Sequence, residues 1–272
     1  MLKMNRRKWF RVLQVMLAVY AVTGVVLWHL QEQLLFHPTP LSAGYRFTFS
    51  LPHKEVSIRL NETDRLHMVQ FFPPESIPPR GIVLYFHGNR ENINRYASFV
   101  PSFTKEGYEV WMPDYPGYGK TTGLRTEYRM YQDAALVYKM AEKQVGSNNI
   151  IIYGKSLGTG VATELASRFN CKKLLLETPY YSIPELAFHH FPIFPTQRMS
   201  KYVFPNYMHL PNVKAPVVIF QGSRDRLIPH KHAIRLLPLL KQSDLFITIP
   251  GGQHNNLSTF ELYRRQLQWA LR

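Results

Sequence analysis

The stretch "NNIIIYGKSLGTGVATELA", residues 148–166, joins a run of bulky apolar residues to a segment rich in glycine and small residues. Ile150 to Tyr153 form a continuous apolar run, which is typical of a strand buried on both faces. The residues after Leu157 carry the spacing of a helix. The stretch therefore predicts a strand, a sharp turn at "GKSLG" (154–158) and a helix. This is the repeating unit of a parallel α/β sheet.

The rest of the chain continues this alternation. An antiparallel hairpin is predicted first, from "KEVSIRL" (54–60) and "RLHMVQFF" (65–72). Helices are expected at 126–144, 157–169, 230–242 and 258–272, and strands at 82–88, 108–114, 149–154, 172–178, 215–222 and 245–251. We therefore expect a mostly parallel, eight-stranded α/β sheet flanked by helices. The 20 prolines argue against an all-helical protein, and the single cysteine excludes an internal disulfide and a multi-cysteine metal site.

The N-terminal segment has the composition of a membrane anchor. Residues 12–30 contain no Asp, Glu, Lys or Arg and would span about 28 Å as a helix. The basic residues before this run are Lys3, Arg6, Arg7, Lys8 and Arg11. The positive-inside rule places 1–11 in the cytoplasm and residues 50–272 across the membrane, in the periplasm if the source is bacterial, with 31–49 as a tether. A cleaved signal peptide ending at "VYA" (19–21) is the alternative.

The formal net charge is +15, from 33 Lys and Arg against 18 Asp and Glu. Ten of these charges lie outside the N-terminal basic group and are spread along the chain. They form no basic cluster interleaved with aromatic residues, so we expect no nucleic-acid partner. A solvated basic surface and attraction to anionic lipid both remain open.

One long segment interrupts the alternation. Residues 180–213 are rich in proline and aromatic residues and too apolar for disorder. An insertion packed on the domain would explain it. We favour a small helical cap at about 180–212 over an active site, with Phe188, Phe191 and Phe194 binding an acyl group.

The pentapeptide at 154–158 fits Gly-x-Ser-x-Gly, a pattern that about one chain in ten of this length contains by chance. Its place between a strand and a helix makes Ser156 a candidate nucleophile, because the glycines permit a sharp turn that exposes the hydroxyl. Asp225 follows a later predicted strand, and His254 follows the next one. A nucleophilic serine needs such a base and an acid that orients it.

An oxyanion hole needs two backbone N–H groups. We expect one from Leu157 and the other from the loop "FHGNREN" (86–92), with Asn89 favoured over Gly88. His87 is interpreted as a structural histidine. Asp114 and Tyr118, in "DYPGYG" (114–119), are expected to shape the rim of the site.

From about residue 50 onward the chain resembles the α/β-hydrolase superfamily, and within it the Bem46-like membrane-anchored serine hydrolases. The resemblance rests on "HGN" (87–89), "DYPGYG", "GKSLG", "GSRD" (222–225) and "GGQHNN" (251–256). It implies the triad Ser156, Asp225 and His254. One departure is Arg90–Glu91, where relatives often carry small residues.

The expected activity is hydrolysis of an ester or thioester that carries an acyl chain or lipid, through an acyl-enzyme. No metal or organic cofactor and no obligate protein partner is expected. The alternatives are an amidase or peptidase, an acyltransferase, or a catalytically silent membrane-anchored binding protein. Removal of residues 1–30 is expected to leave a soluble, reactive domain.

Overall fold

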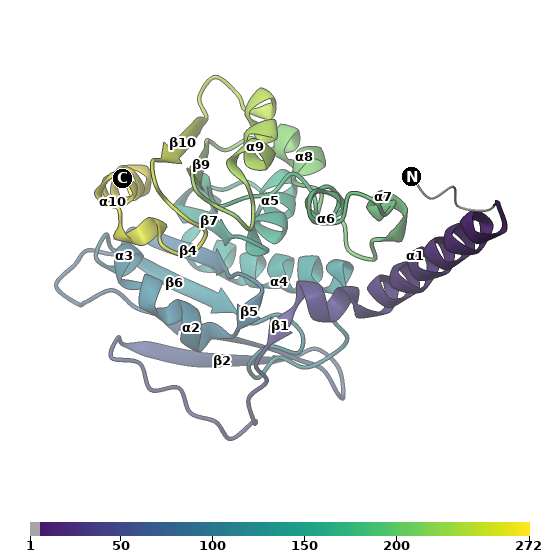
Figure 1. Ribbon diagram of the computed structural model, residues 1–272. Helices are drawn as coiled ribbons and strands as arrows, with labels where there is room; N and C mark the ends of the chain where they lie inside the picture. Colours follow the sequence, from purple (N-terminus) through teal and green to yellow (C-terminus); the bar gives the residue numbers. More distant parts are fainter. Residues whose placement is uncertain (1–5) are drawn as a thin grey trace.

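The computed structural model describes residues 6–272, so Lys3 and the rest of the first five residues lie outside the described residues. A twisted eight-stranded sheet forms its centre, in the order β10-β9-β8-β7-β4-β6-β3-β2 (Figure 1). Its strands are β2 (His53–Arg59), β3 (Arg65–Phe71), β4 (Gly81–Phe86), β6 (Tyr108–Pro113), β7 (Ile150–Lys155), β8 (Lys173–Glu177), β9 (Val217–Gly222) and β10 (Leu245–Ile249). Only the pairings β2–β3 and β3–β6 are antiparallel, which confirms the predicted early hairpin and mostly parallel sheet.

Helices cover both faces of the sheet because the strands carry apolar residues on both sides. Ile82 and Leu84 of β4 belong to one buried cluster with residues of α4 and α5. Val83 and Tyr85, which point the other way, belong to a second cluster with residues of α3 and α10. The helices of the body are α2 (Ile93–Tyr96), α3 (Pro101–Thr104), α4 (Glu127–Val145), α5 (Gly158–Arg168), α9 (His230–Ala233) and α10 (Glu261–Leu271).

The predicted insertion is a group of three short helices between β8 and β9. They are α6 (Ile183–His190), α7 (Thr196–Met199) and α8 (Asn206–His209). Phe194, Tyr202 and Phe204 anchor the segment because their side chains are buried. We call residues 180–212 the cap.

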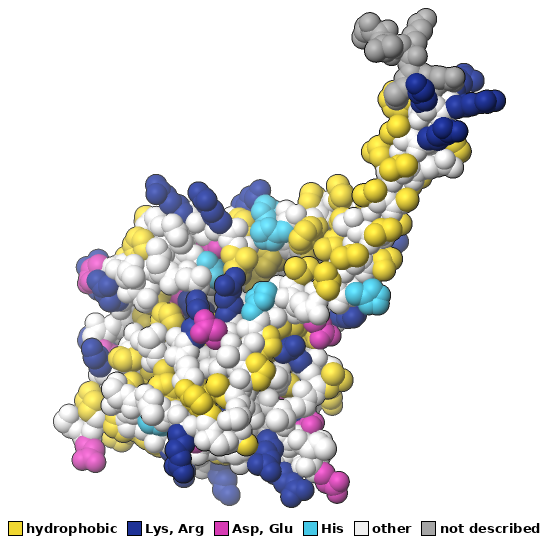
Figure 2. All heavy atoms as spheres, turned by 60° about the horizontal axis from the view of Figure 1, so that its bottom comes forward, with side chains coloured by type: hydrophobic (Ala, Val, Ile, Leu, Met, Phe, Trp, Pro, Cys, Tyr) yellow, Lys and Arg dark blue, Asp and Glu magenta, His cyan; other side chains and the backbone are white. Residues whose placement is uncertain are grey.

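A single helix, α1 (Arg6–Leu35), leaves the body and carries the N-terminus away from it (Figure 1). It has 30 residues, or about 45 Å of helix, and none of them is buried. It is long and apolar enough to cross a membrane, by length and composition. Figure 2 shows hydrophobic side chains along α1 and basic side chains at its far end.

The segment 31–49 differs from the free tether expected from the sequence. Helix α1 continues to Leu35, and β1 (His37–Pro38) then pairs in parallel with β5 (Arg90–Glu91). The side chains of Phe36 and Phe47 are buried. The sequence suggested a linker because of its prolines and polar residues, but its aromatic side chains pack on the domain and fix the exit of α1.

Candidate active site

Ser156 lies on a strained turn between β7 and α5. Its φ of 52° is in the left-handed region, which non-glycine residues rarely occupy. The flanking positions must be glycine because a Cβ atom at either of them would collide with the backbone. A Cβ on Gly158 would lie 2.0 Å from the carbonyl oxygen of Phe86, and one on Gly154 would lie 2.6 Å from the carbonyl oxygen of Gly158. The turn therefore holds the hydroxyl of Ser156 above the sheet.

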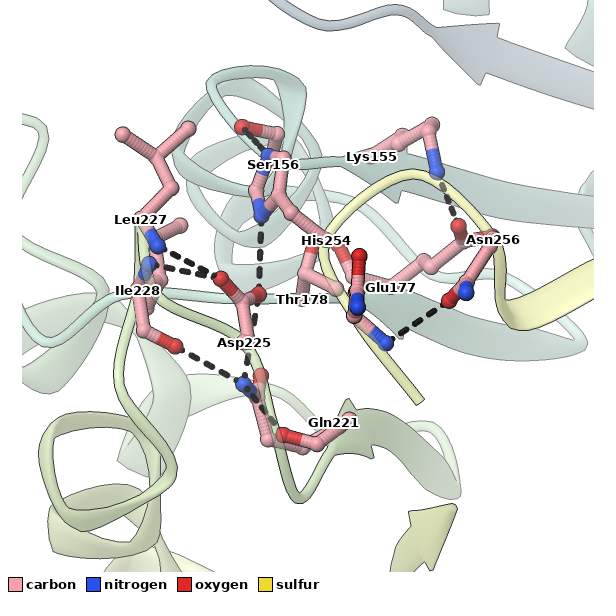
Figure 3. A network of polar contacts seen from close by, with 12 residues as sticks. Lys155, Ser156, Glu177, Thr178, Gln221, Asp225, Leu227, Ile228, His254 and Asn256 are labelled. Carbon is pink, nitrogen blue, oxygen red and sulfur yellow. Dashed lines mark hydrogen bonds and ion pairs between the residues drawn. The ribbon is translucent and has the colours of Figure 1, made fainter. Parts of the chain in front are cut away.

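The structure brings Ser156, His254 and Asp225 into one hydrogen-bonded chain (Figure 3). The Oγ of Ser156 is 2.9 Å from Nε2 of His254. The Nδ1 of the same ring is 2.8 Å from Oδ2 of Asp225. The three side chains come from the ends of β7, β9 and β10, where the sequence placed them. The arrangement has the geometry of a nucleophile, a base and an orienting acid.

Asp225 is fixed by its own loop. Its Oδ1 accepts hydrogen bonds from the backbone N–H groups of Leu227 and Ile228, both at 2.9 Å. The amide of Gln221 donates to Oδ2 at 3.4 Å and to the carbonyl of Ile228 at 2.9 Å. Because the Asp225 side chain is fully buried, these donors stabilise its charge and leave Oδ2 directed at His254.

The two expected oxyanion donors lie beside the nucleophile. Within residues 6–272, no hydrogen-bond acceptor is recorded for the backbone N–H of Leu157 or of Asn89, so both remain available to a substrate. The side chain of Asn89 donates to the carbonyl of Leu35 at 2.7 Å. The carbonyl of Asn89 accepts from the His37 N–H at 2.9 Å and from the Tyr118 hydroxyl at 2.7 Å. The oxyanion loop is therefore tied to the end of α1.

His87 and Asp114 form a second, fully buried pair. The Nε2 of His87 is 3.2 Å from Oδ1 of Asp114, and its Nδ1 is 2.7 Å from the carbonyl oxygen of Gly88. Its ring stacks on Tyr96 and packs on Tyr115. Burial raises the pKa of Tyr96 to about 12, so that hydroxyl stays neutral. These contacts support the structural interpretation of His87.

Arg90 and Glu91 form β5 and are exposed, so the departure from small residues in this loop adds charges that face solvent.

The sequence did not single out Lys155, which the structure pairs with Glu177 beneath the nucleophile. Both side chains are buried, and Tyr153 and Tyr263 also donate to the Glu177 carboxylate. Burial would raise the pKa of Glu177, but the Lys155 charge and these hydrogen bonds outweigh it and lower the pKa. The backbone carbonyl of Glu177 accepts from the Ser156 N–H at 2.9 Å, so the pair supports the turn.

A cavity of about 230 Å³ adjoins Ser156 and Leu157. Phe191 and Phe194 of the cap line it. Phe188 does not: it lies in a separate hollow of the cap with His189, Lys231, His232 and Arg235. The cavity also has a wall that the sequence analysis did not foresee, made by residues of α1. They are Leu27, Trp28, Gln31, Leu34 and Leu35.

No cluster of His, Cys, Asp and Glu side chains able to hold a metal ion occurs in the described part of the chain. A hydroxyl with a hydrogen-bonded imidazole and two free N–H donors is suited to attack on a carbonyl carbon.

A family model described as "Serine aminopeptidase, S33" matches residues 77–209. The chain is 28% identical over 227 residues to alpha/beta hydrolase domain-containing protein aho-3 of Caenorhabditis elegans, covering 80% of this chain and 67% of the relative. It is 28% identical over 194 residues to alpha/beta hydrolase domain-containing protein 17C of Xenopus tropicalis, covering 70% and 61%. A Pyrococcus furiosus esterase superposes with a TM-score of 0.67 at 17% identity, covering 87% of this chain and 97% of the esterase.

The chain belongs to the α/β-hydrolase superfamily. It is a serine hydrolase of that superfamily, with relatives of the Bem46-like type at about 28% identity. The P. furiosus structure supports the shared fold, while the two animal relatives support the family. The chain spans 67% of the nematode relative and 61% of the frog relative.

Proposed function

We propose that the protein is a membrane-anchored serine hydrolase that cleaves a carboxylic ester or thioester of an acyl chain or lipid. The observation that carries the proposal is the apolar cavity beside Ser156. Its walls are side chains such as Ile183, Leu186, Phe191 and Phe194. A chain of methylene groups would fill such a space, because each buried methylene contributes about 0.8 kcal/mol.

In the proposed mechanism, His254 takes the proton of Ser156 as Oγ attacks the carbonyl carbon. Asp225 keeps the imidazole in the tautomer that accepts this proton and stabilises the charged ring. The N–H groups of Leu157 and Asn89 hold the oxyanion. Protonated His254 then gives its proton to the leaving alcohol or thiol. Water activated by His254 attacks the acyl-enzyme and releases the acid.

A peptidase that recognises a free amino terminus is the second candidate, and the description of the matching family favours it. Such a substrate carries a positive charge close to the scissile bond. Among the described residues that line the cavity, none is Asp or Glu, so no carboxylate would pair with that charge. The charge pattern of the cavity therefore supports an acyl substrate.

The anchor proposal rests on α1. Most of its apolar residues are exposed, and the basic residues Arg6, Arg7, Lys8 and Arg11 precede them. In a type II orientation these residues lie in the cytoplasm and the catalytic domain lies outside it. Basic residues such as Lys201 of the cap and Lys231 of the neighbouring α9 would face anionic lipid headgroups.

A chain-length series tests the substrate class. The full-length protein in detergent micelles is assayed with p-nitrophenyl esters from acetate to palmitate. We expect kcat/KM to rise with chain length by up to about fourfold per methylene until the cavity is filled. Ser156→Ala is the control and should be inactive. Cleavage of amino-acid anilides by a protein that leaves the whole ester series intact would contradict the proposal and favour the peptidase.

A further inference from the structure

We propose that the C-terminal half of α1 is part of the substrate site, and that the tip of the cap lies in the hydrocarbon of the bilayer. The acyl chain of a membrane-resident ester would then pass from the bilayer into the cavity between α1 and the cap without crossing water. We call residues 191–195, "FPIFP", the cap tip. The inference rests on the proposed function, because it concerns how that substrate reaches Ser156.

One face of α1 is turned towards the cavity. Leu27, Gln31 and Leu35 are partly shielded and line it, while Val25 and Val26 are exposed. The spacing of four residues places the lining side chains on a single stripe of the helix. An anchor used only for attachment needs no such stripe, so α1 contributes a wall of the site.

Specific contacts hold this half of α1 against the cap. The ring of Tyr20 stacks on Phe194 with centroids 4.9 Å apart, and its hydroxyl donates to the carbonyl of Ile193 at 3.0 Å. Further along the helix, Gln31 donates to the carbonyl of Met199 at 3.2 Å and accepts from the Lys201 N–H at 2.6 Å. These contacts cover about three turns of α1.

The length of the uncharged part of α1 before Tyr20, compared with the thickness of the bilayer, places the cap at membrane depth. The uncharged residues that precede Tyr20, numbers 12–19, span only about 12 Å, against about 30 Å of hydrocarbon. The segment of α1 that touches the cap must therefore lie in the bilayer as well. Trp28, with Lys201 over its ring, suits the headgroup boundary. Tyr20 and the neighbouring Ile193 then lie about 12 Å deeper.

The cap tip is suited to lipid. Ile193 is 70% exposed and Phe191 is 41% exposed, although both are large and apolar. Backbone N–H groups are costly in hydrocarbon unless they are paired. Pro192 and Pro195 have none, and those of Phe191 and Phe194 bond to the carbonyls of Ala187 and Phe191 at 2.8 and 3.1 Å. The Tyr20 hydroxyl satisfies the Ile193 carbonyl.

Depth-dependent quenching tests the immersion. Ile193→Cys is labelled with bimane and the full chain is reconstituted in phosphatidylcholine vesicles that contain lipids brominated on the acyl chain. Burial raises the pKa of the only native thiol, Cys171, to about 12, so it should label slowly. Val15→Cys on α1 is the positive control, and Arg265→Cys on α10, at the opposite side of the body, is the negative control (Figure 1). The native chain controls for labelling of Cys171.

We expect the Ile193 label to be quenched as strongly as the Val15 label, and the Arg265 label to be unaffected. Quenching at Ile193 no stronger than at Arg265 would overturn the proposal. The proposal would also be overturned if the purified protein lacked residue 15, because the N-terminal part of α1 would then have been cleaved off. Quenching requires no catalysis, and labelling with a fluorophosphonate in the same vesicles reports the nucleophile. Failure of the inference and failure of the proposed function are therefore distinguished.

A matched pair of variants tests whether α1 forms a wall of the substrate cavity. Leu27→Trp fills the cavity from α1, whereas Val26→Trp places the same indole on the exposed, non-lining face. If the indole excludes two methylenes, the ratio of kcat/KM for palmitoyl over butyryl ester should fall about 15-fold in Leu27→Trp. It should stay at the wild-type value in Val26→Trp. Equal ratios in the two variants would overturn the role of α1.

Discussion

Replacing Asp225 by Asn should prevent His254 from acting as the base while leaving the fold intact. In the native loop, Oδ1 of Asp225 accepts two backbone N–H groups, from Leu227 and Ile228, at 2.9 Å each. The Asn side chain must keep its oxygen there, because turning its NH₂ group towards these donors would lose both bonds. The NH₂ group therefore faces Nδ1 of His254.

An NH₂ donor beside Nδ1 makes that nitrogen the acceptor, so the proton moves to Nε2, opposite the Ser156 hydroxyl. His254 then cannot take the serine proton. A wrong tautomer of this kind lowers kcat by about 10⁴, which corresponds to about 5.4 kcal/mol in the barrier. Since the two loop hydrogen bonds remain, we expect the melting temperature to change by only a few degrees.

The assay compares kcat for p-nitrophenyl butyrate in the full-length variants, with melting measured on the same samples. Asp244→Asn is the matched control. It alters another buried carboxylate, which accepts from the Val217 N–H at 2.9 Å and touches neither Ser156 nor His254. We expect this control to lose stability and to keep kcat within a few-fold. If a folded Asp225→Asn protein kept more than a tenth of the native kcat, the tautomer argument would be refuted.

Three further predictions follow from the same geometry. Gly158→Ala places a Cβ 2.0 Å from the carbonyl oxygen of Phe86, so the free energy of unfolding should fall by about 3 kcal/mol or more in a denaturant titration. Lys155→Met leaves the Glu177 carboxylate unpaired and should cost about 3–5 kcal/mol at pH 7. In the native chain the lowered pKa of Glu177 stabilises the fold above the ordinary pKa of about 4.3, and this contribution is lost as pH falls below it. In the variant burial would instead raise the pKa of Glu177, so the variant should gain stability as pH falls from 7 and the carboxyl protonates; a melting temperature that falls instead would count against the pairing. Asn89→Ala removes the side-chain hydrogen bond between the oxyanion loop and the Leu35 carbonyl at the end of α1, and should lower kcat about fivefold, equal to about 1 kcal/mol. An unchanged kcat would show that this bond is dispensable.

The sheet could be predicted from the sequence because its strands are nearly uniform apolar runs and its helices carry clear periodicity. The order Ser156, Asp225, His254 could also be predicted, since each residue directly follows a strand. In a parallel sheet those strand ends meet at one edge. Local patterns therefore predict that three side chains meet at one site, although Ser156 and Asp225 lie 69 positions apart and Asp225 and His254 lie 29 apart.

The packing between segments that are far apart in the chain could not be predicted from the sequence in the same way. Residues 31–49 look like a linker by composition, yet Phe36 and Phe47 are buried on the body. The stripe on α1 resembles any membrane helix, because only the cap shows which of its faces is covered. Phe188, Phe191 and Phe194 were equivalent in sequence, but α6 ends at His190, and only the latter two lie along the cavity.

The buried pair of Lys155 and Glu177 was also missed, because charged residues at strand ends are usually exposed. The signal for the pair was that Lys155 ends one strand, directly before the nucleophile, and Glu177 ends the next strand. Register between neighbouring strands pairs these two residues.

Mass spectrometry of the fluorophosphonate adduct tests the central claim most directly. The full-length protein in vesicles is treated with the probe, digested, and mapped by peptide sequencing. The account predicts one modified site, Ser156, in the peptide that contains "GKSLG", and no adduct in folded Ser156→Ala. A modified residue elsewhere, or a folded native protein that takes up no probe, would contradict it.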